Sequence, residues 1–222
     1  MARLRPSSSD TTNYDMKRAL LAIIFACFTL TVMAQEVIKV KYEGARPTIQ
    51  DFAQALLFSG DVDDNDCDEA SNAAANAMTH YLKGEPQEEG QTFTLDQKNG
   101  FMLYESKYKD PEFGEYLTRY EMCYWNEADQ KHKMIGYSVA CYHNGKYEPG
   151  QFDGLVFYRY NNAKKTMELC YEPGFENVCY TEDGANVTYS LPRSGKDITA
   201  TFWYENRKTQ KTLKWDGHQF KY

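Results

Sequence analysis

The stretch NGFMLYESKYKDPEFGEYLTRYEMCYWNEADQKHKMIGYSVACYHNG, residues 99–145, decides the fold class. Apolar and polar residues alternate through much of it, and an Asn-Gly dipeptide stands at each end. Alternation with a period of two is typical of β-strands, because successive side chains point to opposite faces of a sheet. Asn-Gly favours the tight turns that close hairpins. The stretch therefore predicts consecutive antiparallel strands.

The same pattern continues toward the end of the chain. Further turn dipeptides occur at Asp153-Gly154, Asp183-Gly184 and Asp216-Gly217. We expect a long antiparallel β-meander over residues 92–222 that forms a curved sheet or a partly closed barrel. The expected strands are Phe101–Tyr108, Tyr116–Trp125, Met134–Tyr142, Leu155–Tyr160, Thr166–Tyr171, Val187–Leu191, Ile198–Tyr204, Thr212–Trp215 and Gln219–Tyr222.

A short α-helical part precedes the meander. Residues 36–42 alternate like a strand, and two amphipathic helices are expected within residues 47–84. Thr48 begins the first helix in a capping-box pattern with Asp51, and an alanine-rich second helix ends at Gly84. The sequence therefore predicts a single α+β domain, residues 35–222, in which an N-terminal strand and a two-helix pair pack on the meander.

The start of the chain carries an export signal. Residues 16–34, MKRALLAIIFACFTLTVMA, combine a positive start, an apolar run and a small residue before the expected cleavage point after Ala34. The apolar run is shorter than the roughly 20 residues of a spanning helix, which disfavours a transmembrane anchor. We expect a secreted or periplasmic protein, and a leader over residues 1–15 that is either not part of the native protein, with Met16 as the true start, or unfolded.

The composition narrows the range of partners. The chain has 25 Lys+Arg against 32 Asp+Glu, a formal net charge of -7. This balance disfavours nucleic acid, because affinity for a phosphate backbone comes mainly from Lys and Arg. With 42% hydrophobic and 26% charged residues, the chain is expected to form a globular domain, most simply a monomer.

The C-terminal tail suggests a relationship. Residues 187–220, VTYSLPRSGKDITATFWYENRKTQKTLKWDGHQF, include the segments LPRSGKDI and KTLKWDGHQF. This tail resembles the C-terminal ends of uncharacterised small secreted proteins of gut Bacteroidetes. The resemblance implies an extracytoplasmic compartment and a β-hairpin tail, and it assigns no activity and no site residues.

Five cysteines follow the expected cleavage point, and two interpretations of their oxidation state remain open. An oxidising compartment permits disulfides, and the chain order favours Cys123 with Cys141 and Cys170 with Cys179, leaving Cys67 over. Alternatively, all five are small buried residues with free thiols. No pair has CxxC spacing, so a zinc site is not expected.

The acidic segment DVDDNDCDE, residues 61–69, is the candidate metal site. Asp61, Asp63 and Asn65 match alternate ligand positions of a calcium loop. Asp66 stands where that loop requires glycine, and Asn72 stands where it requires a bidentate glutamate. Ca²⁺ is thus one interpretation, and a solvated acidic start of the second helix is the other.

No recognised catalytic motif is present in the sequence, and we predict no catalytic residue. Cys141 and His143 are two apart on an expected strand and would share one face, but nothing identifies a third group to orient the histidine.

Aromatic residues, 15% of the chain, provide the main functional hypothesis. Neighbours on a strand point to opposite faces, so a sheet covered on one side by helices would leave some rings exposed. Exposed rings can stack on sugars or contact a protein; ordinary core packing is the alternative. The candidate ligand-binding residues are Trp125, Tyr158, Tyr160, Trp203 and Trp215.

The sequence therefore predicts an exported, non-catalytic protein that binds a glycan or a protein partner. Two alternatives remain. One is an extracytoplasmic hydrolase, which a histidine clustered with two carboxylates would favour. The other is an inhibitor-like module, which a protruding, rigid turn at Asn144-Gly145 would favour.

Overall fold

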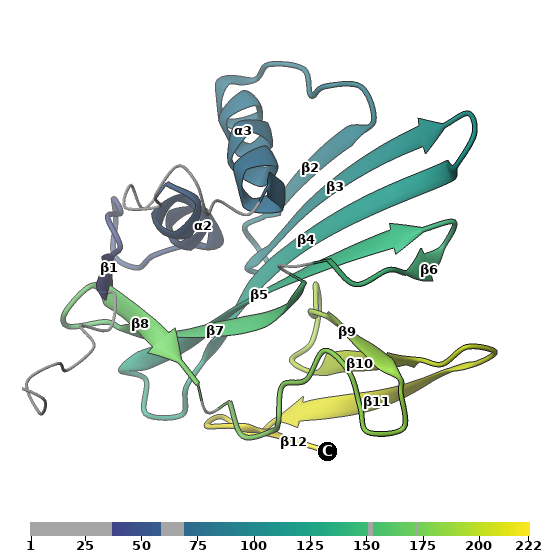
Figure 1. The fold of residues 1–222 in the computed structure, drawn as a ribbon. Helices are drawn as coiled ribbons and strands as arrows, with labels where there is room; N and C mark the ends of the chain where they lie inside the picture. The colour runs from purple at the N-terminus through teal and green to yellow at the C-terminus, as the bar shows by residue number, and fades with distance from the viewer. Residues whose placement is uncertain (1–36, 59–68, 151–152, 172) are drawn as a thin grey trace, which may run out of the picture. The chain divides into compact units, whose positions relative to one another are not determined.

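The alternating segments form a large antiparallel sheet that does not close on itself within the described residues. The computed structural model describes residues 37–58, 69–150, 153–171 and 173–222 (Figure 1). The strand order is β1-β8-β7-β5-β4-β3-β2, and β6 pairs with β5. The strands are β1 Val37–Lys39, β2 Gln91–Asp96, β3 Phe101–Asp110, β4 Gly114–Asn126, β5 His132–His143, β6 Lys146–Tyr147, β7 Gly154–Asn161 and β8 Thr166–Cys170. The meander is confirmed, but closure into a barrel is wrong, because β1 and β2 do not pair with each other.

Two helices, α2 (Ile49–Leu57) and α3 (Glu69–Lys83), cover one face of this sheet (Figure 1). The carboxylate of Asp51 accepts hydrogen bonds from the amide and the hydroxyl of Thr48, at 2.7 and 2.8 Å, which fixes the start of α2. Gly84 follows α3 with φ of 70°, as expected for a glycine that ends a helix. The predicted helical pair is therefore confirmed.

The C-terminal strands form a second sheet, which the sequence did not predict. Its order is β12-β11-β10-β9. The strands are β9 Asn186–Ser190, β10 Ile198–Trp203, β11 Lys208–Trp215 and β12 Phe220–Lys221. This sheet packs against the face of the large sheet opposite the helices (Figure 1). The expected single meander thus divides into two sheets, because both faces of the large sheet are apolar.

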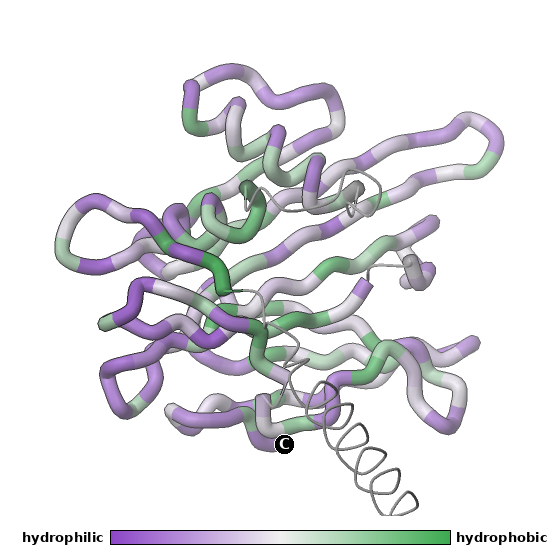
Figure 2. The backbone as a smooth tube through the Cα atoms, turned by 60° about the vertical axis from the view of Figure 1, so that its left-hand side comes forward, coloured by the Kyte–Doolittle hydropathy of each residue, from purple (hydrophilic) through white to green (hydrophobic). Residues whose placement is uncertain are grey.

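The alternation in β4 divides the interior into two cores. Tyr120 and Met122 belong to the core beneath the helices, whereas Cys123 and Trp125 belong to the core between the two sheets. The connecting turns are mostly hydrophilic, and hydrophobic residues lie along the strands and helices (Figure 2). Large residues on successive positions are therefore buried on both faces, which a sheet covered on one side would not allow.

Candidate functional site

Three of the five candidate aromatic residues lie in the interior. Trp125, Tyr160 and Trp215 are 4%, 0% and 8% exposed. The indole of Trp125 donates a hydrogen bond to the carbonyl of Lys196 at 2.8 Å, and its ring centroid lies 6.1 Å from that of Trp215. The prediction that these three rings face solvent is wrong, because the second sheet and the helices cover both faces of the large sheet.

The other two candidates are only half-buried. Tyr158 in β7 packs at the margin of the helix-side core, with its ring centroid 6.3 Å from that of Tyr137. Trp203, the last residue of β10, donates from Nε1 to the hydroxyl of Thr188 at 2.9 Å. Trp203 lines a cavity of the described part of the chain, so a binding site can be built from it.

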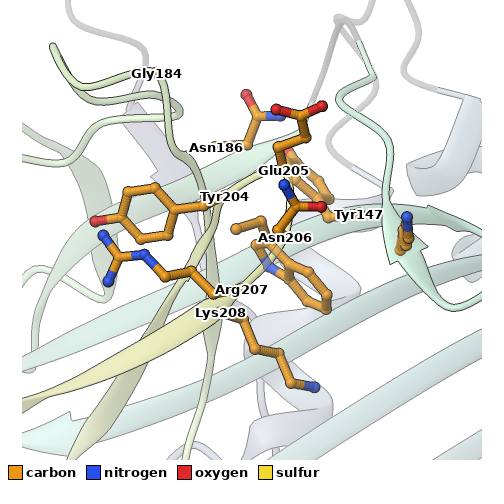
Figure 3. Close-up of a pocket in the computed structure, with 10 residues that line it drawn as sticks. Tyr147, Gly184, Asn186, Tyr204, Glu205, Asn206, Arg207 and Lys208 are labelled. Atoms are coloured by element: carbon orange, nitrogen blue, oxygen red, sulfur yellow. The ribbon is translucent and has the colours of Figure 1, made fainter.

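We use the name Trp203 groove for the cavity of about 830 Å³ beside this residue. Its walls come from β6, from the start of β9 and from the turn between β10 and β11 (Figure 3). Strand pairing sets Trp203 between Asn186 of β9 and Lys208 of β11. The residues used below are Lys146, Asn186, Trp203, Tyr204, Arg207 and Lys208.

A tight turn holds the charged side of the Trp203 groove. The amide of Tyr204 donates to the carbonyl of Arg207 at 2.8 Å, which closes the β10–β11 hairpin. The guanidinium of Arg207 lies beside the Tyr204 ring (Figure 3), 4.1 Å from its centre. The Lys208 ammonium lies 5.2 Å from the centre of the Trp203 ring. Each of these aromatic rings therefore carries a cation beside it.

The β6 wall contributes a third aromatic residue and a further cation. Tyr147 is 8% exposed, and burial together with the nearby Asp153 carboxylate raises the pKa of its hydroxyl. Lys146, its neighbour, is exposed at the rim. Among the lining residues, Lys146, Arg207 and Lys208 outnumber the single acidic residue, Glu205.

A histidine does cluster with two carboxylates, at another place. Within the described residues, Glu127, Asp129 and His132 bring their ligand atoms within 4.8 Å of one another. Arg159 Nε and Nη2 donate to the two carboxylate oxygens of Glu127 at 2.7 and 2.6 Å. The arginine thus supplies the positive charge that a metal ion would bring, which disfavours a metal at this cluster.

Both ring nitrogens of His132 are engaged. Nδ1 lies 2.6 Å from a carboxylate oxygen of Asp129, and Nε2 lies 3.1 Å from the side-chain nitrogen of Asn161. The oxygen of that same amide accepts from the backbone of Ala163 and Lys164. This fixes the amide orientation, so His132 donates from Nδ1 and accepts at Nε2. The cluster joins the β4–β5 turn to β7, and it offers the hydrolase alternative no free imidazole nitrogen.

The expected disulfides do not form. Cys123, Cys170 and Cys179 carry free thiols. In the β4–β5 ladder Cys123 is opposite Gly136, whereas Cys141 is opposite Thr118. The two cysteines are thus five ladder positions apart, roughly 17 Å, which a disulfide cannot span. The predicted Cys123–Cys141 and Cys170–Cys179 bridges are therefore wrong.

Two other sequence hypotheses concern loops. Asp61, Asp63 and Asn65 of the candidate calcium loop lie outside the described residues, as do Cys67 and the expected signal peptide. The Asn144-Gly145 turn is tied to its neighbour, since the Asn144 side chain accepts from the amide of Glu115 at 3.0 Å. It is therefore braced along the β3–β4 hairpin.

His143 is likewise engaged away from Cys141. Its ring stacks on that of Tyr116, with centroids 4.4 Å apart and planes 3° apart. Its Nε2 lies 2.6 Å from the carbonyl oxygen of Phe113. These contacts give His143 a structural role at the β3–β4 hairpin, and the thiol–imidazole hypothesis gains no support.

The sequence analysis did not predict most residues of the Trp203 groove. Lys146 and Asn186 come from segments far from Trp203 in the chain. Strand pairing places Asn186 opposite Trp203, whereas Lys146 belongs to β6, which pairs with β5 of the large sheet. The available local signal was the polar turn Glu205-Asn206-Arg207, which directly follows two aromatic residues.

The described helices include none long and apolar enough to cross a membrane. Comparisons of the chain with protein-family models, with curated proteins and with solved structures found no match.

Proposed function

We propose that this protein is an exported, non-catalytic binding protein that recognises an acidic saccharide in the Trp203 groove. The observation that carries the proposal is the pairing of two half-buried aromatic rings, Trp203 and Tyr204, with exposed cations in a cavity of about 830 Å³. A cavity of this volume can hold a ligand of up to several sugar units.

The groove offers the two kinds of contact that an acidic sugar needs. The faces of the rings provide flat, rigid apolar surface, on which the C–H face of a sugar ring can stack. Asn186 and Asn206 provide amide donors and acceptors for hydroxyl groups. The guanidinium of Arg207 provides a fork of donors that matches a carboxylate or a sulfate.

The cations beside the rings do not obstruct such a ligand. Arg207 and Lys208 are exposed, and a cation–ring contact at an exposed site contributes only about 0.5–1 kcal/mol. An acidic sugar can therefore displace these side chains from the ring faces while it keeps their charges as partners. The formal net charge of -7 makes this basic groove a local exception on an acidic protein.

The test is binding of saccharides of defined charge to the purified protein. We would compare an oligogalacturonate, a sulfated heparin fragment and a neutral cello-oligosaccharide by titration calorimetry. We expect saturable binding of at least one acidic probe and weaker binding of the neutral one. Trp203→Ala and Arg207→Ala should each weaken that binding at least tenfold.

Matched controls keep the test specific. Tyr171 is an exposed aromatic residue, 79% exposed, that does not line the groove, and Lys214 is an exposed cation of β11 that also lies outside it. Tyr171→Ala and Lys214→Ala should bind as the parent protein does. Absence of binding to all three probes, or equal binding by Trp203→Ala and the parent, would refute the proposal.

A further inference from the structure

A buried lysine lies at a second cavity without a carboxylate partner. Lys133 in β5 is 8% exposed. Its ammonium donates to the side-chain oxygen of Asn126 and lies 4.7 Å from the centre of the Tyr124 ring. Among the described residues no carboxylate lies within 4.0 Å of this ammonium. A buried ammonium normally requires a counter-charge, because neutral partners offset only part of its desolvation.

A second cation faces the same cavity. Arg46, in the segment before α2, lines it from the exposed side. Burial, together with the positive charge of Arg46, lowers the pKa of the Lys133 amine. Two cations that repel each other across a cavity leave a place for a negative group.

The two acids of the neighbouring β4–β5 turn already have other partners. Glu127 accepts hydrogen bonds from two guanidinium nitrogens of Arg159, Nε and Nη2, and Asp129 is bound by His132. Their charges are therefore shared with other partners, and Lys133 and Arg46 gain no counter-charge from them. The positive charge of the cavity is left for a molecule that enters it.

The cavity has the size and the lining for a small anion with polar substituents. Its volume is about 490 Å³. Amide side chains from the end of β4, the β4–β5 turn and the β7–β8 turn line the same cavity. The polar lining residues are Arg46, Asn126, Gln130, His132, Lys133 and Asn162.

We propose that this cavity binds a small oxyanion-bearing molecule, of about one sugar ring in size, through Lys133 and Arg46. A carboxylate, a phosphate and a sulfate share the required chemistry. The oxyanion lies between the ammonium and the guanidinium, and the amides contact the rest of the ligand. This site is independent of the Trp203 groove, since the two share no lining residue.

Titration calorimetry with four probes tests the proposal: inorganic phosphate, inorganic sulfate, glucuronate and, as the neutral comparison, glucose. We expect saturable binding of at least one anion and none of glucose at the same concentration. The anion that binds tightest shows whether a carboxylate or a tetrahedral oxyanion is preferred. Absence of saturable binding for all three anions would overturn the proposal.

The key variant is Lys133→Met, which keeps the length and the apolar stem of the side chain while removing its charge. It should weaken anion binding at least tenfold. Arg46→Gln, at an exposed position, should weaken binding several-fold and remains informative if Lys133→Met fails to fold. The assignment would be refuted if Arg46→Gln and a folded Lys133→Met both kept the parental affinity. If Lys133→Met does not fold, parental affinity in Arg46→Gln alone would refute it.

Two further variants separate this site from other sources of affinity. Lys164→Met removes an exposed cation from the β7–β8 turn, outside the cavity lining, and should leave binding unchanged. Arg207→Ala removes any binding of these anions at the Trp203 groove, and the binding that depends on Lys133 should persist in it. If Arg207→Ala abolishes the anion binding and Lys133→Met does not, the anion occupies the Trp203 groove and the second site is refuted.

Discussion

Glu121 in β4 accepts a hydrogen bond from the backbone amide of Leu191 at 2.7 Å and thereby joins the two sheets. Leu191 directly follows β9, and the two residues lie 70 positions apart in the chain. The Glu121 carboxylate is only 4% exposed, and Arg119 Nε lies 3.1 Å from it. A buried carboxylate therefore stands at the junction of the two sheets, and its ionisation should affect stability.

Burial raises the pKa of Glu121, and the Arg119 charge and the Leu191 amide offset only part of this effect. The folded state then binds the proton more tightly than the unfolded state does. We expect the free energy of unfolding to fall as the pH rises from about 4.3, the usual value for an unfolded glutamate, through the raised pKa. Urea denaturation between pH 4 and 8 measures this slope.

Glu121→Gln should reduce that slope, because the amide does not ionise while its oxygen can still accept from Leu191. Glu105→Gln is the matched control, since Glu105 also contacts Arg119 at 3.4 Å but is more exposed. An unchanged slope in Glu121→Gln would contradict the assignment of the pH dependence to Glu121.

Asp129 has the opposite behaviour. Its hydrogen bond with His132, supported by the backbone amides of Lys131 and His132, lowers its pKa to about 2. The stability it contributes is present above about pH 4 and is lost as the pH falls toward 2. Carbon NMR titration of the carboxylate should show the low pKa, and His132→Gln should raise it. A value near 4 in the parent protein would argue against this hydrogen-bond network.

The ring of Trp125 occupies the space where a side chain at position 136 would lie. A Cβ at Gly136 would lie 3.0 Å from the Trp125 ring and 3.2 Å from that of Phe157. Gly136→Ala should therefore lower the free energy of unfolding by about 1–3 kcal/mol through overpacking. With Trp125→Phe, which makes room, the double variant should lose less than the sum of the single variants in chemical denaturation. Strict additivity would show that the two residues do not compete for space.

The two tryptophans at the ends of β4 and β10 should differ in their effect on stability. Trp125→Ala removes a buried ring and should cost about 3–5 kcal/mol. Trp203→Ala removes a half-exposed ring and one hydrogen bond, and should cost about 1–2 kcal/mol. Chemical denaturation of both variants compares the costs. Equal losses would mean that Trp203 is a core residue, which would weaken its assignment to a binding groove.

The cysteines should differ in reactivity. Cys123 is buried, and burial raises the pKa of its thiol well above the usual range. Cys179 is exposed, although partial burial of its thiol also raises its pKa. Iodoacetamide should modify Cys179 at least tenfold faster than Cys123 in the native protein, as measured by peptide mass spectrometry. Unfolding in guanidinium should bring the two rates together; similar rates before unfolding would contradict the burial of Cys123.

The sequence predicted correctly those features that depend on interactions between residues close together in the chain. The capping pair Thr48 and Asp51, the glycine after α3 and the alternation through β4 depend on neighbours within a few residues, and each predicted its element correctly. The resemblance of the tail to secreted bacterial proteins and the export signal remain predictions.

The exposure of the aromatic side chains could not be predicted from neighbouring residues in this way. Alternation assigns Tyr124 and Trp125 to opposite faces of β4, but it does not state what covers each face. The covering depends on residues 186–221 leaving the meander to form a second sheet. Disulfide pairing failed for a related reason, since strand register decides which cysteines are opposite each other.

By itself, the sequence determined most of the strands, although not β2 or β6, together with the two helices and the acidic balance of the chain, because these follow from residue spacing and composition. Only the tertiary structure decided which rings are buried and which charges lack partners. Burial and charge pairing depend on segments far apart in the chain, such as Arg46 with Lys133 and Asn186 with Trp203, and free energies of desolvation arise only once those segments meet.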